Sequence, residues 1–371
     1  MFITALDLGS SQIKILVGEI ERDNKLSLLG VLKSGSAGMR RGELVSPDDI
    51  SGQLGRMLND VKQIHKTALK NIFINVNGAN VRIHNSRGIV AVSRADNEIY
   101  QDDVDRVLKA SQAINLGANR MILHTLTREF IVDGSAGIMD PLGMVGNRLE
   151  VHSLIVDAFK SSVNNVIKSV ELAGGEIAGL IYSPLAASRS VLNKTQKDLG
   201  VVMVDIGNST TGISIYEEDN LLQASVLPMG AGNITNDLAI GLKCSVKAAE
   251  AIKLSFGFAL AKEISNKEKV KLIGKLGKLP AGVVLAGGGA KTPGIVELAK
   301  QELKLSVQIG IPEISNLESV NADFGAELED PEFAVSAGLL VCGNEESVKD
   351  RGWLIAKKSN WPSKILKYFL P

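Results

Sequence analysis

Two segments of the sequence have the composition of a phosphate-binding turn. In each, a short apolar run reaches an Asp, turns over Gly and small hydroxyl residues, and continues as a second apolar run. These are residues 3–17, which contain Asp7, and residues 201–215, which contain Asp205. Glycine lets the backbone come close to a ligand, and successive turn amides with Ser or Thr hydroxyls form an anion-binding concavity. An Asp at a strand end can hold a hydrated divalent cation beside that anion.

Either segment alone would most simply be an ordinary β-hairpin, because the order Asp-x-Gly-x-Ser/Thr is common. One copy in each half of the chain instead favours two related domains that face each other across a nucleotide. Asp7 and Asp205 would then serve Mg²⁺ through water. The predicted phosphate ligands are Asp7, Gly9, Ser10, Ser11 and Lys14 on one side and Asp205, Gly207, Asn208, Ser209 and Thr210 on the other.

Two further features suit the remainder of a nucleotide. An apolar run ends in Gly287, Gly288 and Gly289, whose backbone can lie flat against an adenosine group, although such a turn alone is often only a turn. Glu250 and Lys253 stand at helical i, i+3 spacing. They could contact ribose and base, with a surface ion pair as the simpler alternative.

The composition limits the class of protein. The chain has 371 residues, its charges balance to zero, and aromatic residues make up 4%. These values argue against a nucleic-acid partner. Cys244 and Cys342 are expected to pack as small hydrophobic side chains in a reducing cytoplasm, and the four His give no zinc-site spacing. We expect no signal peptide, because Asp7 and Lys14 interrupt the apolar start, and no apolar run long enough to span a bilayer.

The surrounding elements predict an α/β protein with an α+β insert. Apolar patterning predicts strands at 3–8, 13–20, 26–34, 72–76, 177–182, 221–228 and 283–285, and helices that begin at 47, 161, 184, 230, 246, 293 and 334. Within the insert it predicts short strands at 81–84, 88–93, 122–126, 128–132 and 148–156, a helix at 102–115 and a loop at 133–143. A further loop is expected at 38–42, before the insert.

The order of these features resembles the superfamily of actin, sugar kinases and heat-shock chaperones. Its pattern is phosphate turn, connecting helix, phosphate turn, adenosine turn, connecting helix, and residues 178–187 and 332–340 suit the connecting helices. The insert narrows the resemblance to FtsA, a family of bacterial actin-like division proteins with an extra subdomain in place of one of actin's. The resembling segments are 85–93, 103–108, 122–124, 128–134 and 140–144.

The resemblance implies an actin-like bilobal fold of two RNase H-like domains that binds ATP and Mg²⁺. It also implies a cytoplasmic protein that self-assembles on the inner face of the cell membrane at the septum. There it would bind the C-terminal tail of FtsZ and contact other division proteins. The implied domains are 1–80 with 158–190 and 191–230 with 283–342 as cores, 81–157 as insert, 231–282 over the nucleotide, 343–358 as linker and 359–371 as amphipathic helix.

The C-terminal segment has the pattern of a membrane-surface helix. Apolar and aromatic side chains share one broad helical face and lysines occupy the opposite face, which suits the plane of an anionic membrane. Packing of this helix back onto the protein is the alternative. The predicted membrane-binding residues are Trp361, Lys364, Ile365, Leu366, Lys367, Phe369 and Leu370.

Two departures from the FtsA pattern bear on function. Region 231–282 is shorter than the resemblance implies, which leaves the docking place of the FtsZ tail open. Ser183 stands where filament-forming bacterial actins often have a Glu before the Pro of the first connecting helix, and Ser is a poor base. We therefore expect at most a slow ATPase, with no confident catalytic residue. The rivals are a small-molecule kinase of the same superfamily and a PilM-like pilus-assembly adaptor.

Overall fold

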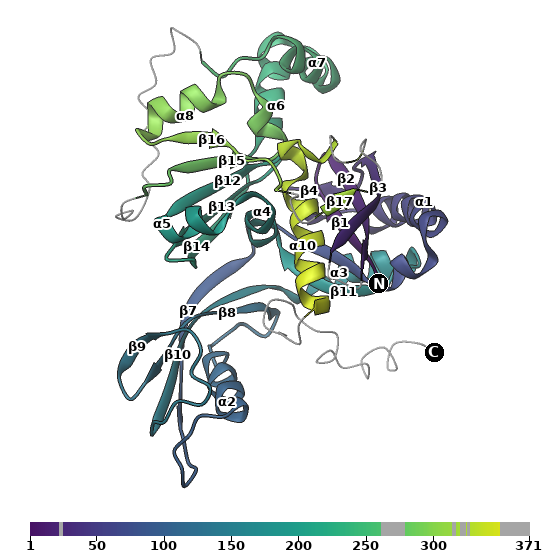
Figure 1. Cartoon of the computed structure of the whole chain (residues 1–371). Coiled ribbons are helices and arrows are strands. Elements are labelled where there is room, and N and C mark those ends of the chain that lie inside the picture. Colours follow the sequence, from purple (N-terminus) through teal and green to yellow (C-terminus); the bar gives the residue numbers. More distant parts are fainter. Residues whose placement is uncertain (22–24, 261–278, 314–316, 320–323, 325–326, 349–371) are drawn as a thin grey trace.

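The computed structural model describes residues 1–21, 25–260, 279–313, 317–319, 324 and 327–348. The chain forms two lobes, each built on a mixed sheet, and a separate subdomain with a third sheet that extends away from them (Figure 1). The α/β class predicted from the sequence is confirmed.

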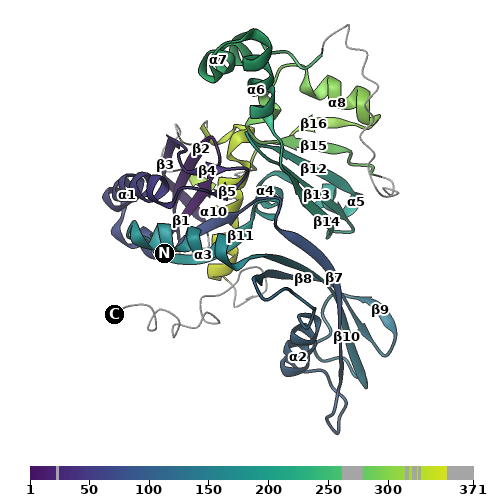
Figure 2. The same cartoon turned by 180° about the vertical axis from the view of Figure 1, so that it is seen from behind.

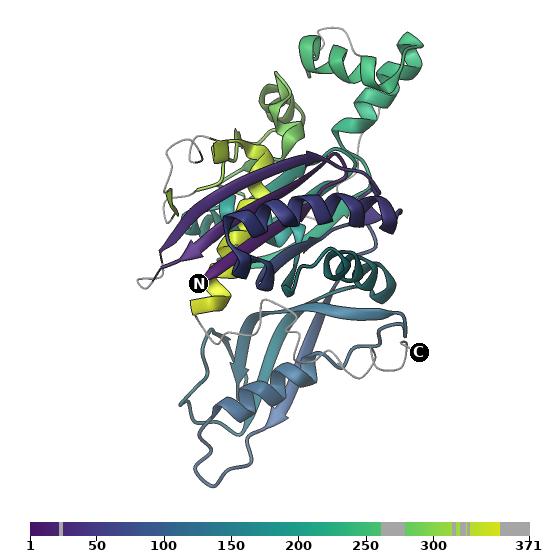
Figure 3. The ribbon, with the colours of Figure 1, turned by 90° about the vertical axis from the view of Figure 1, so that its right-hand side faces the viewer.

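The first lobe is built on a six-stranded sheet. In spatial order its strands are β11 (Ile177–Tyr182), β6 (Ile72–Val76), β1 (Phe2–Leu8), β2 (Gln12–Ile20), β3 (Leu26–Gly35) and β17 (Leu317–Ser319). β1 to β3 form an antiparallel meander, whereas β6 runs parallel to both β1 and β11. Helices α1 (Pro47–Ile64) and α3 (Lys160–Leu172) pack together in front of this sheet in Figure 3, and α10 (Ala334–Val348) passes behind it. Helices on both faces explain why β1 and β2 are nearly continuous apolar runs.

The second lobe repeats this topology. Its strands, in spatial order, are β14 (Asn220–Leu227), β13 (Thr211–Glu217), β12 (Val201–Ile206), β15 (Val283–Ala286) and β16 (Val307–Ile309). β12 to β14 are an antiparallel meander like β1 to β3, and β15 runs parallel to β12 as β6 does to β1. The two predicted phosphate turns therefore join equivalent strand pairs, β1–β2 and β12–β13.

The insert leaves the first lobe after β6 and returns at α3. Its sheet has the order β7 (Arg82–Ala91), β10 (Arg148–Phe159), β8 (Arg120–Val132) and β9 (Ser135–Ile138), and α2 (Gln101–Ser111) packs on β7 and β10. Two expectations were wrong here. The predicted strand pairs 81–84 with 88–93 and 122–126 with 128–132 are single strands, and the predicted loop 133–143 contains β9. The polar residues 85–87 interrupt the apolar pattern, but they pair without a break with 152–154 of β10.

Two connecting helices cross between the lobes. α4 (Ser183–Val191) and α10 approach so closely that a Cβ on Gly338 would lie 1.8 Å from the carbonyl oxygen of Ala186. Only glycine fits at this crossing. α10 continues to Val348, which corrects the expectation that a linker begins at 343. The remainder of the predicted linker and the predicted C-terminal helix lie outside the described residues.

Helices α6 (Ala231–Leu242) and α7 (Val246–Phe256) project from the second lobe beside α8 (Ile295–Leu303), as Figures 1 and 2 show. Several short elements were not predicted. β4 (Met39–Arg40) and β5 (Glu43–Leu44) pair where a loop was expected, and α5 (Lys194–Leu199) begins at an Asn193 cap. Within the part of the chain that the structure describes, no helix is both long and apolar enough to span a membrane.

Candidate functional site

A cleft of about 1430 Å³, open to solvent, lies between the two lobes. It is lined by all fifteen residues that the sequence predicted to hold the nucleotide. The fold therefore brings together both turns, the glycine run 287–289, and Glu250 with Lys253 on α7, which we call the α7 pair. These residues are Asp7, Gly9, Ser10, Ser11, Lys14, Asp205, Gly207, Asn208, Ser209, Thr210, Glu250, Lys253, Gly287, Gly288 and Gly289.

The first turn places a carboxylate and an ammonium group opposite each other. The Gly9 amide donates a hydrogen bond of 3.1 Å to the carbonyl of Gln12, which closes the turn. In the β1–β2 register Asp7 pairs with Lys14, and the Lys14 Nζ lies 3.8 Å from Oδ2 of Asp7. Both side chains are buried. Burial raises the pKa of Asp7, and the charge of Lys14 opposes that rise.

The second turn has the same backbone but lacks the lysine. The Gly207 amide donates to the carbonyl of Thr210 at 2.9 Å, and Asp205 pairs with Gly212 across the strands. Burial and then the charge of Asp7 raise the pKa of Asp205 to about 6, while Lys14 opposes them. A carboxylate whose pKa is raised by burial and by a second carboxylate in the same cleft is an arrangement that a divalent cation relieves.

The glycine run begins against Asp205. Gly287 has φ of +81°, and a Cβ there would lie 2.3 Å from Oδ1 of Asp205 and 2.6 Å from the carbonyl oxygen of Ile206. Any side chain would fill the space beside the carboxylate, so the turn needs glycine. The run continues into η2 (Gly288–Lys291), which also lines the cleft.

The α7 pair is partly committed to contacts within the protein. Glu250 Oε2 lies 2.8 Å from Lys253 Nζ, and Lys253 also donates to the hydroxyl of Thr235 at 2.9 Å and to the carbonyl of Ala231 at 3.3 Å. The ion pair that was the simpler alternative is therefore present. It is not a surface pair, however, because the Lys253 side chain is only 12% exposed and both residues line the cleft.

Sequence reasoning missed several polar residues that line the cleft, among them Asn75, Asn77, Lys291 and Glu332. The two Asn were detectable as polar residues at the end of the apolar run of β6. Glu332 lies in η3 (Pro331–Phe333) and receives a hydrogen bond of 2.9 Å from Lys33, which together with nearby lysines lowers its pKa despite burial. Lys291 lies 3.5 Å from the same carboxylate, so Glu332 joins groups from both lobes.

Ser183 has no freedom to act as a base. Its buried hydroxyl donates to the carbonyl of Val76 at 3.3 Å and accepts from Nδ2 of Asn75 at 3.2 Å. Both hydrogen-bonding roles are thus used within the protein. This geometry agrees with the expectation of little hydrolysis, since the hydroxyl has no group that takes its proton.

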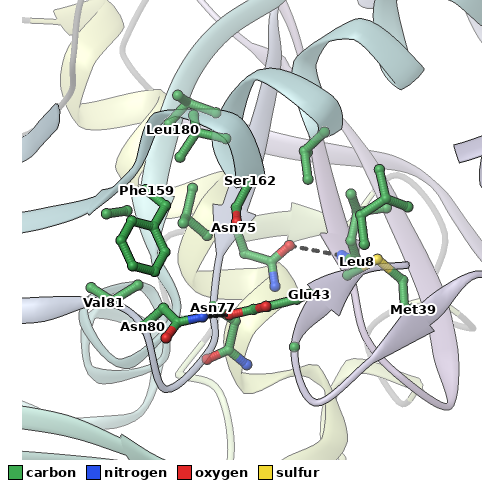
Figure 4. A pocket seen from close by; sticks show the side chains of 16 residues that line it. Leu8, Met39, Glu43, Asn75, Asn77, Asn80, Val81, Phe159, Ser162 and Leu180 are labelled. Carbon is green, nitrogen blue, oxygen red and sulfur yellow. Dashed lines mark hydrogen bonds between the residues drawn. The ribbon is translucent and has the colours of Figure 1, made fainter. Parts of the chain in front are cut away.

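A much smaller pocket lies next to the cleft, between the first lobe and the start of the insert. Figure 4 shows it between Met39 and Leu8 on one side and Val81, Phe159 and Leu180 on the other. Asn75 and Asn77 line both cavities and so form part of the wall between them.

Comparison with known proteins gives relatives over most of the chain. A family model described as cell division protein FtsA matches residues 202–338, and a model of the SHS2 domain inserted in FtsA matches residues 78–157. The cell division protein FtsA of Pseudomonas aeruginosa is 31% identical over 92% of this chain and 89% of its own. That of Neisseria meningitidis serogroup B is 30% identical over 97% of each.

Solved structures with lower identity share the fold. PilM, in a PilM–PilN type IV pilus biogenesis complex, superposes with a TM-score of 0.65 at 16% identity, over 92% of this chain and 98% of its own. MreB5 of Spiroplasma citri bound to AMPPNP gives a TM-score of 0.52 at 10% identity, over 94% of this chain and 96% of its own. These likenesses confirm the actin-like bilobal fold, and the SHS2 match confirms the insert.

Proposed function

Because the chain belongs to the FtsA family of cell division proteins, we propose that it binds ATP with Mg²⁺ between its lobes, assembles on the cytoplasmic face of the membrane at the septum, and anchors FtsZ filaments there. The convergence of Asp7 and Asp205 in one cleft carries this proposal. Each stands beside a glycine turn with Ser or Thr hydroxyls, and the two turns come from different lobes, so a ligand that contacts both holds the lobes together.

The donor set suits a triphosphate and a divalent cation. Ser10, Ser11, Ser209 and Thr210 would donate hydroxyl hydrogen bonds to phosphate oxygens, and Lys14 would add a positive charge. Asp7 and Asp205 would hold Mg²⁺ through water, as oxygen ligands do for this cation. Bound Mg²⁺–ATP would supply a charged bridge between the lobes. The glycine run 287–289 and the α7 pair would receive the adenosine.

Slow turnover follows from the surroundings of Ser183. Hydrolysis needs a group that orients water and accepts its proton, and Ser183 is committed to Val76 and Asn75. A kinase of the same superfamily would need a carboxylate base near the phosphate acceptor. Rapid phosphoryl transfer to sugars or acetate would contradict the proposal.

The FtsZ tail would dock on the apolar face of α6 and α7. Ile240 is 76% exposed and Phe256 is 83% exposed, and further apolar side chains of these helices are also solvent-accessible. Extended exposed apolar patches mark protein–protein interaction sites. The face remains although the region 231–282 is short. Residues 261–278 lie outside the described part, so the docking site rests on α6 and α7 alone.

Membrane binding rests on the sequence of the C-terminal segment. Its aromatic and apolar face with opposing lysines would lie in the plane of an anionic membrane. One short helix binds weakly, but self-assembly would present many copies at once and raise the total affinity. Assembly, membrane contact and ATP binding would therefore support one another.

Calorimetry tests the nucleotide site. Wild-type protein should bind Mg²⁺–ATP, and Asp205→Ala should abolish measurable binding, because the cation loses a carboxylate that only the second lobe provides. Leu172→Ser is the control for general effects of substitution and purification, since this exposed residue lies at the end of α3 and does not line the cleft. Unchanged affinity in Asp205→Ala would refute the assignment.

Co-sedimentation tests the two partners. Deletion of residues 361–371 should abolish binding to vesicles that contain anionic lipids, and survival of binding would exclude the segment as the anchor. The double variant Ile240→Ser/Phe256→Ser should weaken binding of an FtsZ tail peptide at least tenfold. Leu172→Ser, which removes an equally exposed apolar side chain elsewhere, should not. Equal loss in both variants would contradict docking on α6 and α7.

A further inference from the structure

Asn75 lies where three parallel strands end. β6 stands between β1 and β11 in the sheet, with Leu6 opposite Ile74 on one side and Ile181 opposite Asn75 on the other. The carboxyl ends of parallel strands meet at one edge of a sheet, which is where ligands bind in such folds. This register brings the Asn75 amide between the end of β1, at Asp7, and the start of α4, at Ser183.

The Asn75 side chain uses both ends of its amide. Its Oδ1 accepts the Leu8 backbone N–H at 2.7 Å, as the dashed line in Figure 4 shows, and its Nδ2 donates to Oδ1 of Asp7 at 2.9 Å. The same Nδ2 donates to the hydroxyl of Ser183 at 3.2 Å. Because Leu8 supplies a donor, the amide oxygen must face Leu8 and the NH₂ group must face Asp7. The amide orientation is therefore fixed by the backbone.

Asp7 needs such a donor because it is buried. A buried carboxylate keeps its charge only where hydrogen bonds or opposite charges replace water. In the described part of the chain its two oxygens have one partner each: Asn75 on Oδ1 and Lys14 on Oδ2. Loss of Asn75 would leave Lys14 as the remaining partner, and the carboxylate would turn toward the ammonium group and away from the centre of the cleft.

We propose that Asn75 is a positioning residue for the cation site: its amide holds the Asp7 carboxylate aimed at the divalent cation without contacting that cation itself. This inference rests on the proposed binding of Mg²⁺–nucleotide. It goes beyond that proposal because it assigns the cation dependence of binding to a neutral side chain on a strand that belongs to neither phosphate turn.

The strand offers its own control. Asn71 precedes β6 at the opposite end, and its Nδ2 donates to the Phe2 carbonyl of β1 at 3.0 Å. Asn71 and Asn75 thus each bond the backbone of β1 through a side-chain amide, but only Asn75 reaches a carboxylate of the cleft. A structural role alone would make the two substitutions equivalent in their effect on binding.

The test compares ADP affinity with Mg²⁺ and with EDTA in wild type, Asn75→Ala and Asn71→Ala, by calorimetry. Asn75→Ala should reduce the gain in affinity that Mg²⁺ provides at least tenfold, with less than a twofold change in EDTA. Asn71→Ala should leave the Mg²⁺ gain within twofold of wild type. Urea unfolding of the metal-free proteins is the second readout, and Asn75→Ala should lose more stability than Asn71→Ala, because the Asn75 amide also bonds the buried Asp7 carboxylate.

The outcomes are separable. If wild type binds no nucleotide, the proposed function fails. If wild type binds with a Mg²⁺ gain that Asn75→Ala retains, the positioning role alone is overturned, and the same holds if Asn71→Ala loses the gain equally. Should Asn75→Ala fail to fold, Asn75→Ser replaces it with a small polar side chain too short to reach Asp7, and the same reduction is expected.

Discussion

The first turn, between β1 and β2, and the second, between β12 and β13, close in the same way. The Gly9 amide bonds Gln12 in one, and the Gly207 amide bonds Thr210 in the other. Their charges differ. Asp7 has a lysine opposite it and an amide beside it, whereas Asp205 has a glycine opposite it and Gly287 against its side chain.

This difference assigns unequal roles to a repeated motif. In the first turn, neighbouring groups of the protein compensate much of the negative charge of Asp7, so this carboxylate costs little stability in the empty cleft. The second turn holds a half-buried carboxylate with a glycine instead of a lysine opposite it, so its compensation is expected to come from a ligand, and the glycines around it leave space for one. The carboxylate of Asp205 therefore lowers the stability of the empty protein while it raises the affinity for the cation, and this conflict is weaker at Asp7.

The largest effect is expected where space beside Asp205 is removed. Gly287→Ala places a Cβ against Oδ1 of Asp205 and the carbonyl of Ile206, and it also forces an Ala into φ of +81°. We expect a loss of about 3 kcal/mol in the free energy of unfolding and loss of Mg²⁺–ATP binding. Urea denaturation and calorimetry measure the two effects. Gly288→Ala is the matched control for stability, because a Cβ there meets nothing within 4 Å, and equal losses would contradict the role given to Gly287.

A gain of stability is expected from Asp205→Asn in metal-free buffer. The pKa of Asp205 in the folded protein is about 6, above its ordinary value of 3.8. The contribution of this group to the free energy of unfolding is therefore fully favourable below pH 3.8 and is lost as the pH rises through 6. At pH 7.5 the amide should therefore stabilise the protein by about 2 kcal/mol, and the gain should shrink toward pH 4.5. Thermal unfolding across this range in EDTA measures it.

The same change in the first turn should behave differently. Asp7→Asn leaves the buried Lys14 without its ion-pair partner, so the gain in metal-free stability should be smaller than for Asp205→Asn or absent. With saturating Mg²⁺–ATP both variants should fall below wild type, because they lose the stabilisation that binding provides. Equal gains from the two Asn variants would break the distinction between the turns.

A smaller effect of opposite sign is expected from Lys14→Met. Asp7 then loses its positive neighbour inside the protein, which should lower the free energy of unfolding at pH 7.5 by about 1–2 kcal/mol. Affinity for ATP should fall about tenfold through the loss of one charge at the phosphates. Unfolding in urea and calorimetry test these values. The second turn has no lysine to remove, so a neutral result for Lys14→Met would remove the charge difference from the comparison.

Much of this site was predictable because it follows local rules. Each turn is a contiguous pattern of Asp, Gly and hydroxyl residues, and the glycine run follows a buried strand, so residue type and order sufficed. Asn75 was detectable as a polar residue at the end of an apolar run, but its role was not predictable, because it depends on neighbours from distant segments. The same dependence hid Glu332 and Lys291. In the fold, β7 and β8 were each predicted as two short strands, because pairing with β10 continues through a polar stretch that interrupts the apolar pattern. The end of α10 was missed because the helix continues to Val348, beyond the last apolar residues of its pattern.

The smallest effect on nucleotide affinity is expected from Asn77, which lies just before the insert. Its side chain forms a hydrogen bond with the second turn. Its Nδ2 donates to the Thr210 hydroxyl at 3.2 Å, across the cleft from the first lobe. A hydrogen bond of this kind contributes about 1 kcal/mol. Asn77→Ala should therefore weaken Mg²⁺–ATP binding only about fivefold, far less than changes at either Asp. Because Thr210 is also a proposed phosphate ligand, a double-mutant cycle with Thr210→Val separates the bridge from direct ligand contact. A coupling free energy of about 1 kcal/mol, measured by calorimetry, would mean that the second turn is held in place from the first lobe. Additive losses would instead mean that the two turns meet only through their ligand, and the asymmetry between them would then be one of charge alone.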